Sequence, residues 1–148
     1  NIKKIHEFLE KKKSDNYTDI LDHKTIIITA DTIVWFRNKV VGKPTDIEDA
    51  KHIIGRLSGN THTVVTGVCL RTKGKIKIFN SVSEVHFTKL AQSEINYYID
   101  NYKPFDKAGA YGIQEWIGYV GIEKIEGSFY NVMGLPVQRL YHELSEFV

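Results

Sequence analysis

Two long runs of β-branched and aromatic residues limit what this chain can fold into more than any other feature of its sequence. Residues 62–71 and 75–88 are rich in Val, Ile, Thr and Phe and flank a glycine turn at 73–74. Runs of this kind around a short turn predict a long antiparallel hairpin. Residues 25–30 are short, β-branched and almost wholly apolar, which is typical of a buried strand, and residues 119–125 form a further candidate. The chain is therefore expected to fold around a sheet.

Segments with helical spacing alternate with these strands. Apolar residues recur every three or four positions in residues 2–13, 45–57 and 93–102, and again after Pro136. Thr45 is expected to cap the second of these helices. In the first helix the predicted buried stripe consists of Ile2, Ile5, Phe8 and Leu9. Helices that alternate with strands indicate an α/β fold with a mixed, twisted sheet flanked by helices.

The composition predicts one globular domain over residues 1–148, because 42% hydrophobic and 26% charged residues are ordinary globular values. The apolar runs are too short to cross a bilayer, and no leader with a cleavage site is visible, so neither a membrane partner nor secretion is expected. Cys69 is the only cysteine, which fits a cytoplasmic location. A net charge of +2 argues against binding to a nucleic-acid polymer but allows a small anionic ligand.

Several common catalytic and metal sites have no sequence pattern here. The six histidines are scattered, and none is spaced with Cys69 as zinc ligands are. The chain contains neither the Gly-x-x-x-x-Gly-Lys-Ser/Thr phosphate loop nor the Gly-x-Ser-x-Gly elbow of hydrolases. These observations argue against a structural zinc site and against both of those enzyme classes.

Asp31 and Thr32 form the first of three polar clusters that remain as candidates. They follow the apolar run at 25–30, so they are expected at the carboxyl end of a buried strand, where open α/β sheets bind their ligands. A carboxylate at that place can hold Mg²⁺ or accept a proton from water. The alternative is that Asp31 only caps the following turn.

Lys43 is the second candidate. It lies between Gly42 and Pro44, directly before the predicted helix at 45–57. A lysine near a helix amino terminus is well placed to meet a phosphate. The alternative is an ordinary exposed loop lysine.

The third cluster is the segment 106–114, with the sequence Asp-Lys-Ala-Gly-Ala-Tyr-Gly-Ile-Gln. Its glycines allow backbone N–H groups to approach a ligand, and Gln114 can both donate to and accept from the edge of a base. The alternative is a tight structural loop in which Asp106 and Lys107 pair in solvent.

The motifs in these clusters follow one another in a recognisable order from about Phe8 to the C-terminus. They are Ala30-Asp31-Thr32, Gly42-Lys43-Pro44, Leu57-Ser58-Gly59-Asn60-Thr61-His62 with Thr66-Gly67, the segment 106–114, Ile125-Glu126-Gly127-Ser128, and Gly134-Leu135-Pro136. Together they resemble the Maf family of nucleoside triphosphate pyrophosphatases. The resemblance implies a two-lobed Maf/ITPase-like architecture with a cleft, a nucleoside triphosphate as substrate, and a possible homodimer.

The resemblance also implies roles for individual residues. Asp31 matches the catalytic acid, which accepts a proton from water and binds Mg²⁺ or another divalent cation such as Mn²⁺. Thr32 and Gln114 match positions that separate subfamilies by base, and this pair is similar to the type that hydrolyses dTTP and UTP to the monophosphate and pyrophosphate. The positions that match substrate-binding residues are Lys13, Lys43, Asp106 and Lys107.

The start of the family pattern has no counterpart in residues 1–148. Maf proteins begin with a strand and a Ser-x-x-Arg phosphate loop, followed by a glutamate near the metal. A non-catalytic nucleotide-binding domain therefore stays open as the alternative to an active dTTP/UTP pyrophosphatase. A related pyrophosphatase that clears non-canonical purine nucleotides is a third reading, although Gln114 beside the Tyr111-Gly112 turn matches the pyrimidine type better.

Overall fold

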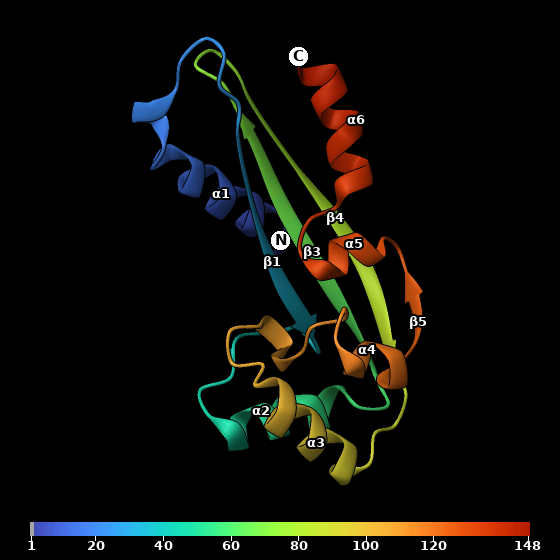
Figure 1. Ribbon diagram of the computed structural model, residues 1–148. Helices are drawn as coiled ribbons and strands as arrows, with labels where there is room; N and C mark the ends of the chain where they lie inside the picture. The colour runs from blue at the N-terminus through green and yellow to red at the C-terminus, as the bar shows by residue number, and fades with distance from the viewer. Residues whose placement is uncertain (1) are drawn as a thin grey trace.

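A five-stranded antiparallel sheet forms the centre of the molecule (Figure 1). The computed structural model describes residues 2–148, without the side chains of Ile2, Lys3, Ile5 and His6. The strands lie in the order β2-β1-β3-β4-β5. They are β1 (Ile27–Phe36), β2 (Lys39–Val41), β3 (Thr61–Arg71), β4 (Ile76–Phe87) and β5 (Ile122–Glu126). The expected mixed sheet is wrong for the described residues, because each strand runs antiparallel to its neighbours.

The β3–β4 hairpin confirms the strongest prediction from the sequence. It pairs continuously from Thr61 opposite His86 to Arg71 opposite Ile76. The turn is closed by two hydrogen bonds, in which the backbone N–H of Thr72 donates to the Lys75 carbonyl (2.9 Å) and the N–H of Lys75 donates to Thr72 Oγ1 (3.1 Å). This hairpin is the longest strand pairing in the sheet.

Helices cover both faces of the sheet and one of its ends (Figure 1). They are α1 (Ile2–Asp15), α2 (Ile47–Leu57), α3 (Gln92–Tyr102), α4 (Trp116–Gly121), α5 (Phe129–Met133) and α6 (Val137–Phe147), with 3₁₀ turns η1 (Thr18–Ile20) and η2 (Ala108–Ala110). The strand predicted over 119–125 begins only at Ile122, since α4 occupies the residues before it. None of the helices in the described part of the chain has the length and apolar character needed to span a bilayer.

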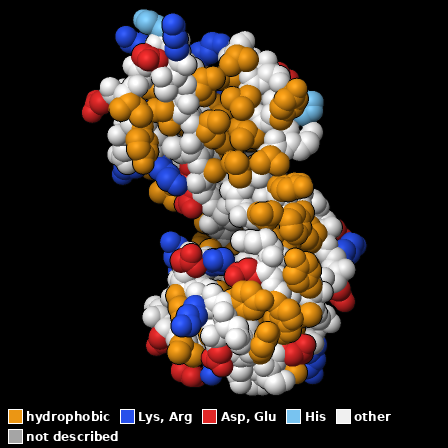
Figure 2. Space-filling model, in the orientation of Figure 1, with side chains coloured by type: hydrophobic (Ala, Val, Ile, Leu, Met, Phe, Trp, Pro, Cys, Tyr) orange, Lys and Arg blue, Asp and Glu red, His pale blue; other side chains and the backbone are white. Residues whose placement is uncertain are grey.

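Two hydrophobic clusters divide the molecule along its length. The larger joins one end of the sheet to α2, α3 and the segment around Tyr111. The smaller joins Val68, Leu70 and Phe79 of the hairpin to α6. Figure 2 shows a waist between the two ends, hollowed on the left, where acidic and basic side chains meet. This arrangement leaves the middle of β1 at the boundary between the clusters.

β1 is one continuous strand that passes through the candidate residues rather than ending at them. It pairs with β3 without interruption from Ile27 to Trp35, so Asp31 and Thr32 lie in mid-strand. The prediction that they follow a strand's carboxyl end is therefore wrong. β2 pairs with β1 only over Val34–Phe36. Among residues 2–148, no strand pairs with the outer edge of β1 before that point, so the edge is open beside Asp31.

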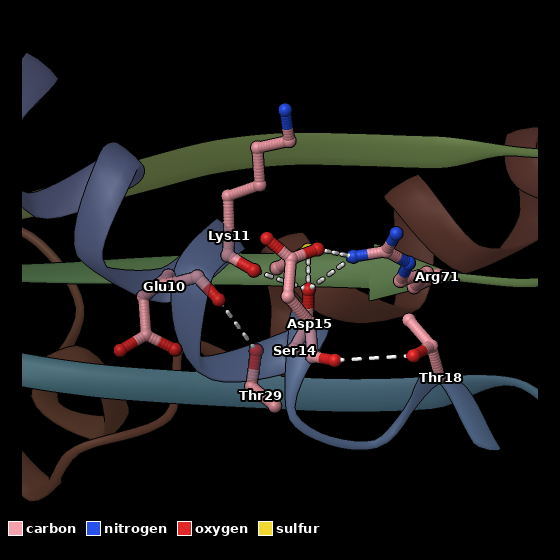
Figure 3. A network of polar contacts seen from close by, with 8 residues as sticks. Glu10, Lys11, Ser14, Asp15, Thr18, Thr29 and Arg71 are labelled. Atoms are coloured by element: carbon pink, nitrogen blue, oxygen red, sulfur yellow. Dashed lines mark hydrogen bonds and ion pairs between the residues drawn. The ribbon is translucent and has the colours of Figure 1, made fainter. Parts of the chain in front are cut away.

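Helix α1 packs on the sheet through polar residues, as Figure 3 shows. Phe8 is 63% exposed and Leu9 is 46% exposed, whereas Glu10 and Ser14 are fully buried. Thr29 Oγ1 donates to the Glu10 carbonyl (3.2 Å), and Arg71 bonds both Ser14 and Asp15. The predicted apolar stripe is therefore wrong at Phe8 and Leu9, and its other two members, Ile2 and Ile5, lie outside the described side chains.

Helix α2 follows its predicted stripe of Ile47, Ala50, Ile53, Ile54 and Leu57 except at its first member. The last four form its buried face, but Ile47 is 48% exposed, so the prediction is wrong there. The cap is Asp46 and not Thr45, because Asp46 Oδ1 accepts from the N–H of Asp49 (2.8 Å). Gly59, the residue after the C-terminal cap of this helix, has a positive φ of 71°, as expected for a glycine at that position.

Candidate active site

A pocket of about 320 Å³ opens beside the middle of β1. Its lining contains six of the seven residues predicted from the sequence to act on a substrate: Asp31, Thr32, Lys43, Asp106, Lys107 and Gln114. The rest of the wall includes Val34 and Val64 from the sheet, Tyr111, and residues 132–134 at the end of α5. Segments that are far apart in the sequence therefore meet in one hollow.

Asp31 lies at the open edge of β1. Its side chain is exposed, and its Oδ1 accepts a hydrogen bond from the backbone N–H of Thr32 (3.0 Å). No described strand pairs with this edge, and Asp31 lines the pocket. A water molecule or a cation bound in the pocket would meet the carboxylate there.

Buried polar residues hold the Thr32 side chain in place through hydrogen bonds. Its Oγ1 lies 2.8 Å from Thr66 Oγ1, and Thr66 Oγ1 donates to the Asn131 carbonyl (3.1 Å). The Asn131 amide in turn donates to Ser83 Oγ (2.9 Å). Thr66, Ser83 and Asn131 are all fully buried. Sequence reasoning singled out neither Ser83 nor Asn131 and assigned Thr66 no role, because a lone polar residue in an apolar run gives no sign of its partners.

Lys43 and the segment 106–114 are joined through the backbone. The N–H of Gly109, which has a positive φ of 74°, donates to the Gly42 carbonyl (3.2 Å). Lys107 Nζ donates to Asp106 Oδ1 (3.1 Å). This hydrogen bond is the main reason why the pKa of Asp106 lies below its usual value, and the positive charge of Lys43 adds to the effect. The alternative of a paired Asp106 and Lys107 is thus observed, but the pair also lines the pocket.

The segment around Gln114 is held by the hydroxyl of Tyr98, a buried residue of α3. Tyr98 Oη accepts from the backbone N–H of Gly112 (3.0 Å) and donates to Glu115 Oε1 (2.8 Å). The N–H of Glu115 donates to the Gly112 carbonyl (3.0 Å), which closes the turn that contains Gln114. Tyr98 follows the helical spacing seen in residues 93–102 and is buried in α3, but nothing in the sequence indicates this contact.

A second buried pair supports the wall of the pocket. His62 Nε2 lies 2.6 Å from the hydroxyl of Tyr111, and both rings pack edge-on against Phe87. Burial, together with the smaller effect of the His86 charge, lowers the pKa of His62 to about 4. Burial also raises the pKa of Tyr111, so both groups are neutral at pH 7.

Lys13 is the predicted site residue that the pocket does not include. It borders a neighbouring hollow with Tyr17, Ile20 and residues 27–30. Its Nζ donates to the Ala30 carbonyl (3.0 Å), and Ala30 lines both hollows. The lysine therefore contacts β1 at Ala30, the residue directly before Asp31.

The donor set suits a magnesium ion that is shared with a substrate rather than held by the protein alone. No group of three His, Cys, Asp or Glu side chains in the described part of the chain could enclose a metal ion. Mg²⁺ commonly binds through one or two carboxylates together with waters and substrate phosphates. Asp31 and Asp106 supply carboxylates to the same pocket, so the residues present fit such an ion.

Gly118 offers a test of how tightly the segment around Gln114 is packed. A Cβ on Gly118 would lie 1.8 Å from the Ile113 carbonyl oxygen. Gly118→Ala should therefore lower the free energy of unfolding by about 2 kcal/mol, which thermal unfolding would measure. Gly55→Ala is the matched control in α2, where a Cβ meets nothing within 4 Å. That helical substitution should stabilise the protein slightly, and equal effects at both positions would contradict the packing argument.

Comparison with known proteins identifies the family of this chain. A family model described as Maf-like protein matches residues 2–147. The chain is 52% identical over 142 residues to a dTTP/UTP pyrophosphatase of Bacteroides thetaiotaomicron, with 96% of this chain and 74% of that protein covered. It is 54% identical over 140 residues to a protein of the same name from Parabacteroides distasonis, with 95% and 72% covered. It is 48% identical over 137 residues to another from Flavobacterium psychrophilum, with 93% and 70% covered. The chain therefore belongs to the Maf family.

Proposed function

We propose that this chain is a dTTP/UTP pyrophosphatase, which hydrolyses these nucleotides to the monophosphate and pyrophosphate in the pocket beside β1. The observation that carries the proposal is the meeting of Asp31, Lys43, Lys107 and Gln114 in one hollow, in a chain about half identical to proteins of that name. Nucleoside triphosphates are cytoplasmic metabolites, so the proposal also favours a cytoplasmic location.

Lys43 and Lys107 are the proposed phosphate ligands. A triphosphate carries several negative charges, which repel an attacking hydroxide and must be neutralised as charge builds on the leaving group. Both lysines line the pocket, and Lys107 is held in place by Asp106. Mg²⁺, or Mn²⁺ in its place, would bind at Asp31 and supply further positive charge to the phosphate oxygens. Lys13 would reach the substrate from the neighbouring hollow.

Asp31 is the proposed proton acceptor. A water molecule attacks the α-phosphorus while Asp31 takes one of its protons. The new bond joins the water oxygen to the α-phosphorus. The bond that breaks joins the α-phosphorus to the oxygen that bridges to the β-phosphate, and pyrophosphate leaves with that oxygen. An exposed carboxylate on a rigid strand is well suited to hold the water in line.

Thr32 and Gln114 are the proposed readers of the base. Both line the pocket, and Gln114 can donate to one group of a pyrimidine edge and accept from another. Tyr98 and Glu115 hold the turn that presents Gln114. A fixed polar pattern of this kind discriminates between bases more strongly than apolar contacts can.

A substrate panel tests the proposal directly. The chain should release pyrophosphate from dTTP and UTP in the presence of Mg²⁺, and much less from ITP or methylated GTP, measured by a coupled pyrophosphate assay. Preference for ITP would instead support the purine-clearing alternative. Binding of dTTP and UTP in calorimetry without any release of pyrophosphate would support the non-catalytic alternative.

A further inference from the structure

We infer that Thr66 is a positioning residue that orients the hydroxyl hydrogen of Thr32, so that Thr32 meets a nucleotide base only as a hydrogen-bond acceptor. The inference deepens the proposed function and rests on it, since it concerns how the same pocket selects thymine and uracil. Thr66 itself is fully buried and acts through Thr32.

The direction of the hydrogen bonds follows from the acceptor at the end of the chain. Thr66 Oγ1 lies 3.1 Å from the Asn131 carbonyl oxygen, and a backbone carbonyl can only accept. Thr66 must therefore donate its single hydrogen to Asn131. In its 2.8 Å contact with Thr32, Thr66 can then only accept, so Thr32 is the donor.

The second contact of the Thr32 hydroxyl leads to the same result. Thr32 Oγ1 lies 3.5 Å from the Gly134 carbonyl oxygen, which is also an obligatory acceptor. Whichever of the two partners receives the Thr32 hydrogen, that hydrogen points into the protein. The oxygen lone pairs are what remain for a molecule in the pocket, which Thr32 lines.

The terminal acceptor is held firmly in place. The Asn131 carbonyl also accepts from the N–H of Gly134 (3.1 Å), and the N–H of Asn131 donates to Ser128 Oγ (3.2 Å). The Asn131 side chain donates to Ser83 Oγ (2.9 Å) and to the Val64 carbonyl (3.3 Å). Because these groups are buried and bonded, the carbonyl cannot turn away and release the Thr66 hydrogen.

An acceptor-only hydroxyl separates the pyrimidine bases by their ring nitrogen N3. Thymine and uracil carry an N3–H donor between two carbonyl groups, whereas N3 of cytosine carries a lone pair. Thr32 can accept from N3–H, but its lone pairs repel that of cytosine. Gln114 can donate to a neighbouring carbonyl of thymine or uracil. The buried hydrogen-bond chain therefore favours dTTP and UTP over CTP.

Thr66→Val tests this inference, because valine has the same shape but cannot accept from Thr32. Only the long, weak contact to the Gly134 carbonyl (3.5 Å) then remains for the Thr32 hydrogen, which is able to turn toward N3 of cytosine. The ratio of kcat/KM for UTP to that for CTP should fall about tenfold, chiefly through a gain on CTP. Thr66→Ser keeps the hydroxyl and should retain the wild-type ratio. Equal losses on UTP and CTP in Thr66→Val would show a merely structural role and overturn the inference.

Thr63→Val is the matched control on the same strand. Thr63 lies on the opposite face of β3, where its hydroxyl donates to Glu84 (3.0 Å), so the ratio should stay at the wild-type value. A similar fall in this control would overturn the inference.

Wild-type protein with UTP methylated at N3 supplies a test that needs no variant. This analogue should be hydrolysed at least about tenfold less efficiently than UTP, because it lacks the N3–H donor. Equal hydrolysis of the two would overturn the inference, while the proposed function would stand. If neither dTTP nor UTP is hydrolysed, the proposed function fails instead, and the relative binding of UTP and CTP in calorimetry still decides the role of Thr66.

Discussion

Asp31→Asn should lower kcat for dTTP and UTP by at least about 100-fold, because positioned proton acceptors contribute about that much or more to catalysis. Asparagine has nearly the same shape as aspartate, and its side-chain oxygen can still accept from the N–H of Thr32. It carries no charge for a cation and cannot take a proton from water. The proposed phosphate ligands, Lys43 and Lys107, are unchanged, so nucleotide binding should survive. The loss should therefore fall mainly on kcat, which steady-state measurements of pyrophosphate release would show.

Asp100→Asn is the control for this substitution. Asp100 is an exposed residue of α3 outside the pocket lining, so its loss should leave turnover at the wild-type level. If Asp31→Asn kept more than a tenth of the wild-type kcat, Asp31 would not be the proton acceptor of the reaction.

The protein should lose stability as the pH falls from about 6.5 to about 4, with His62 as a main cause. Burial lowers the pKa of His62 from 6.5 to about 4 in the folded protein. Between these values the unfolded chain binds the proton and the folded protein does not, so acid favours unfolding. The effect is full below the folded pKa and absent above the unfolded one. A shift of this size corresponds to about 3 kcal/mol of unfolding free energy, which urea titrations across this pH range would measure.

His62→Gln separates this effect from the protonation of carboxylates. Glutamine does not titrate and can still bond the Tyr111 hydroxyl, so the variant should lose less stability in acid than the wild type. His52→Gln changes an exposed histidine of α2 and should leave the acid sensitivity intact. Identical pH profiles for wild type and His62→Gln would show that His62 is not the responsible group.

Local patterns predicted the elements whose burial follows sequence periodicity. The hairpin of β3 and β4 and the buried face of α2 are of this kind, since each needs only its own alternation of apolar and polar residues. The order of motifs also predicted which side chains would share a pocket, and six of the seven do. Lys13 adjoins that pocket through Ala30.

Features that depend on contacts between residues far apart in the sequence could not be predicted from local patterns. Helix α1 buries Glu10 and Ser14 because Thr29, Cys69 and Arg71 offer polar contacts there, and nothing in residues 2–13 indicates this. The strand was expected to end before Asp31, but pairing with β3 carries it onward to Trp35, and pairing with β2 extends it to Phe36. The five-residue helix α5 is too short to show a periodicity.

Because β1 is unbroken, it separates two proposed roles, that of Asp31 at the phosphates and that of Thr32 at the base. Neighbouring residues on a strand point to opposite faces, so Asp31 and Thr32 serve the same pocket from two sides of the open edge. The phosphate end and the base end of a nucleotide would then be separated by the width of one strand. Their spacing is fixed by a single peptide bond, and a slip of one residue in register would move both side chains to the opposite faces of the sheet. Under the proposed function, the segment that carries Gln114 can vary between proteins, whereas the distance from Thr32 to Asp31 is set by the backbone itself.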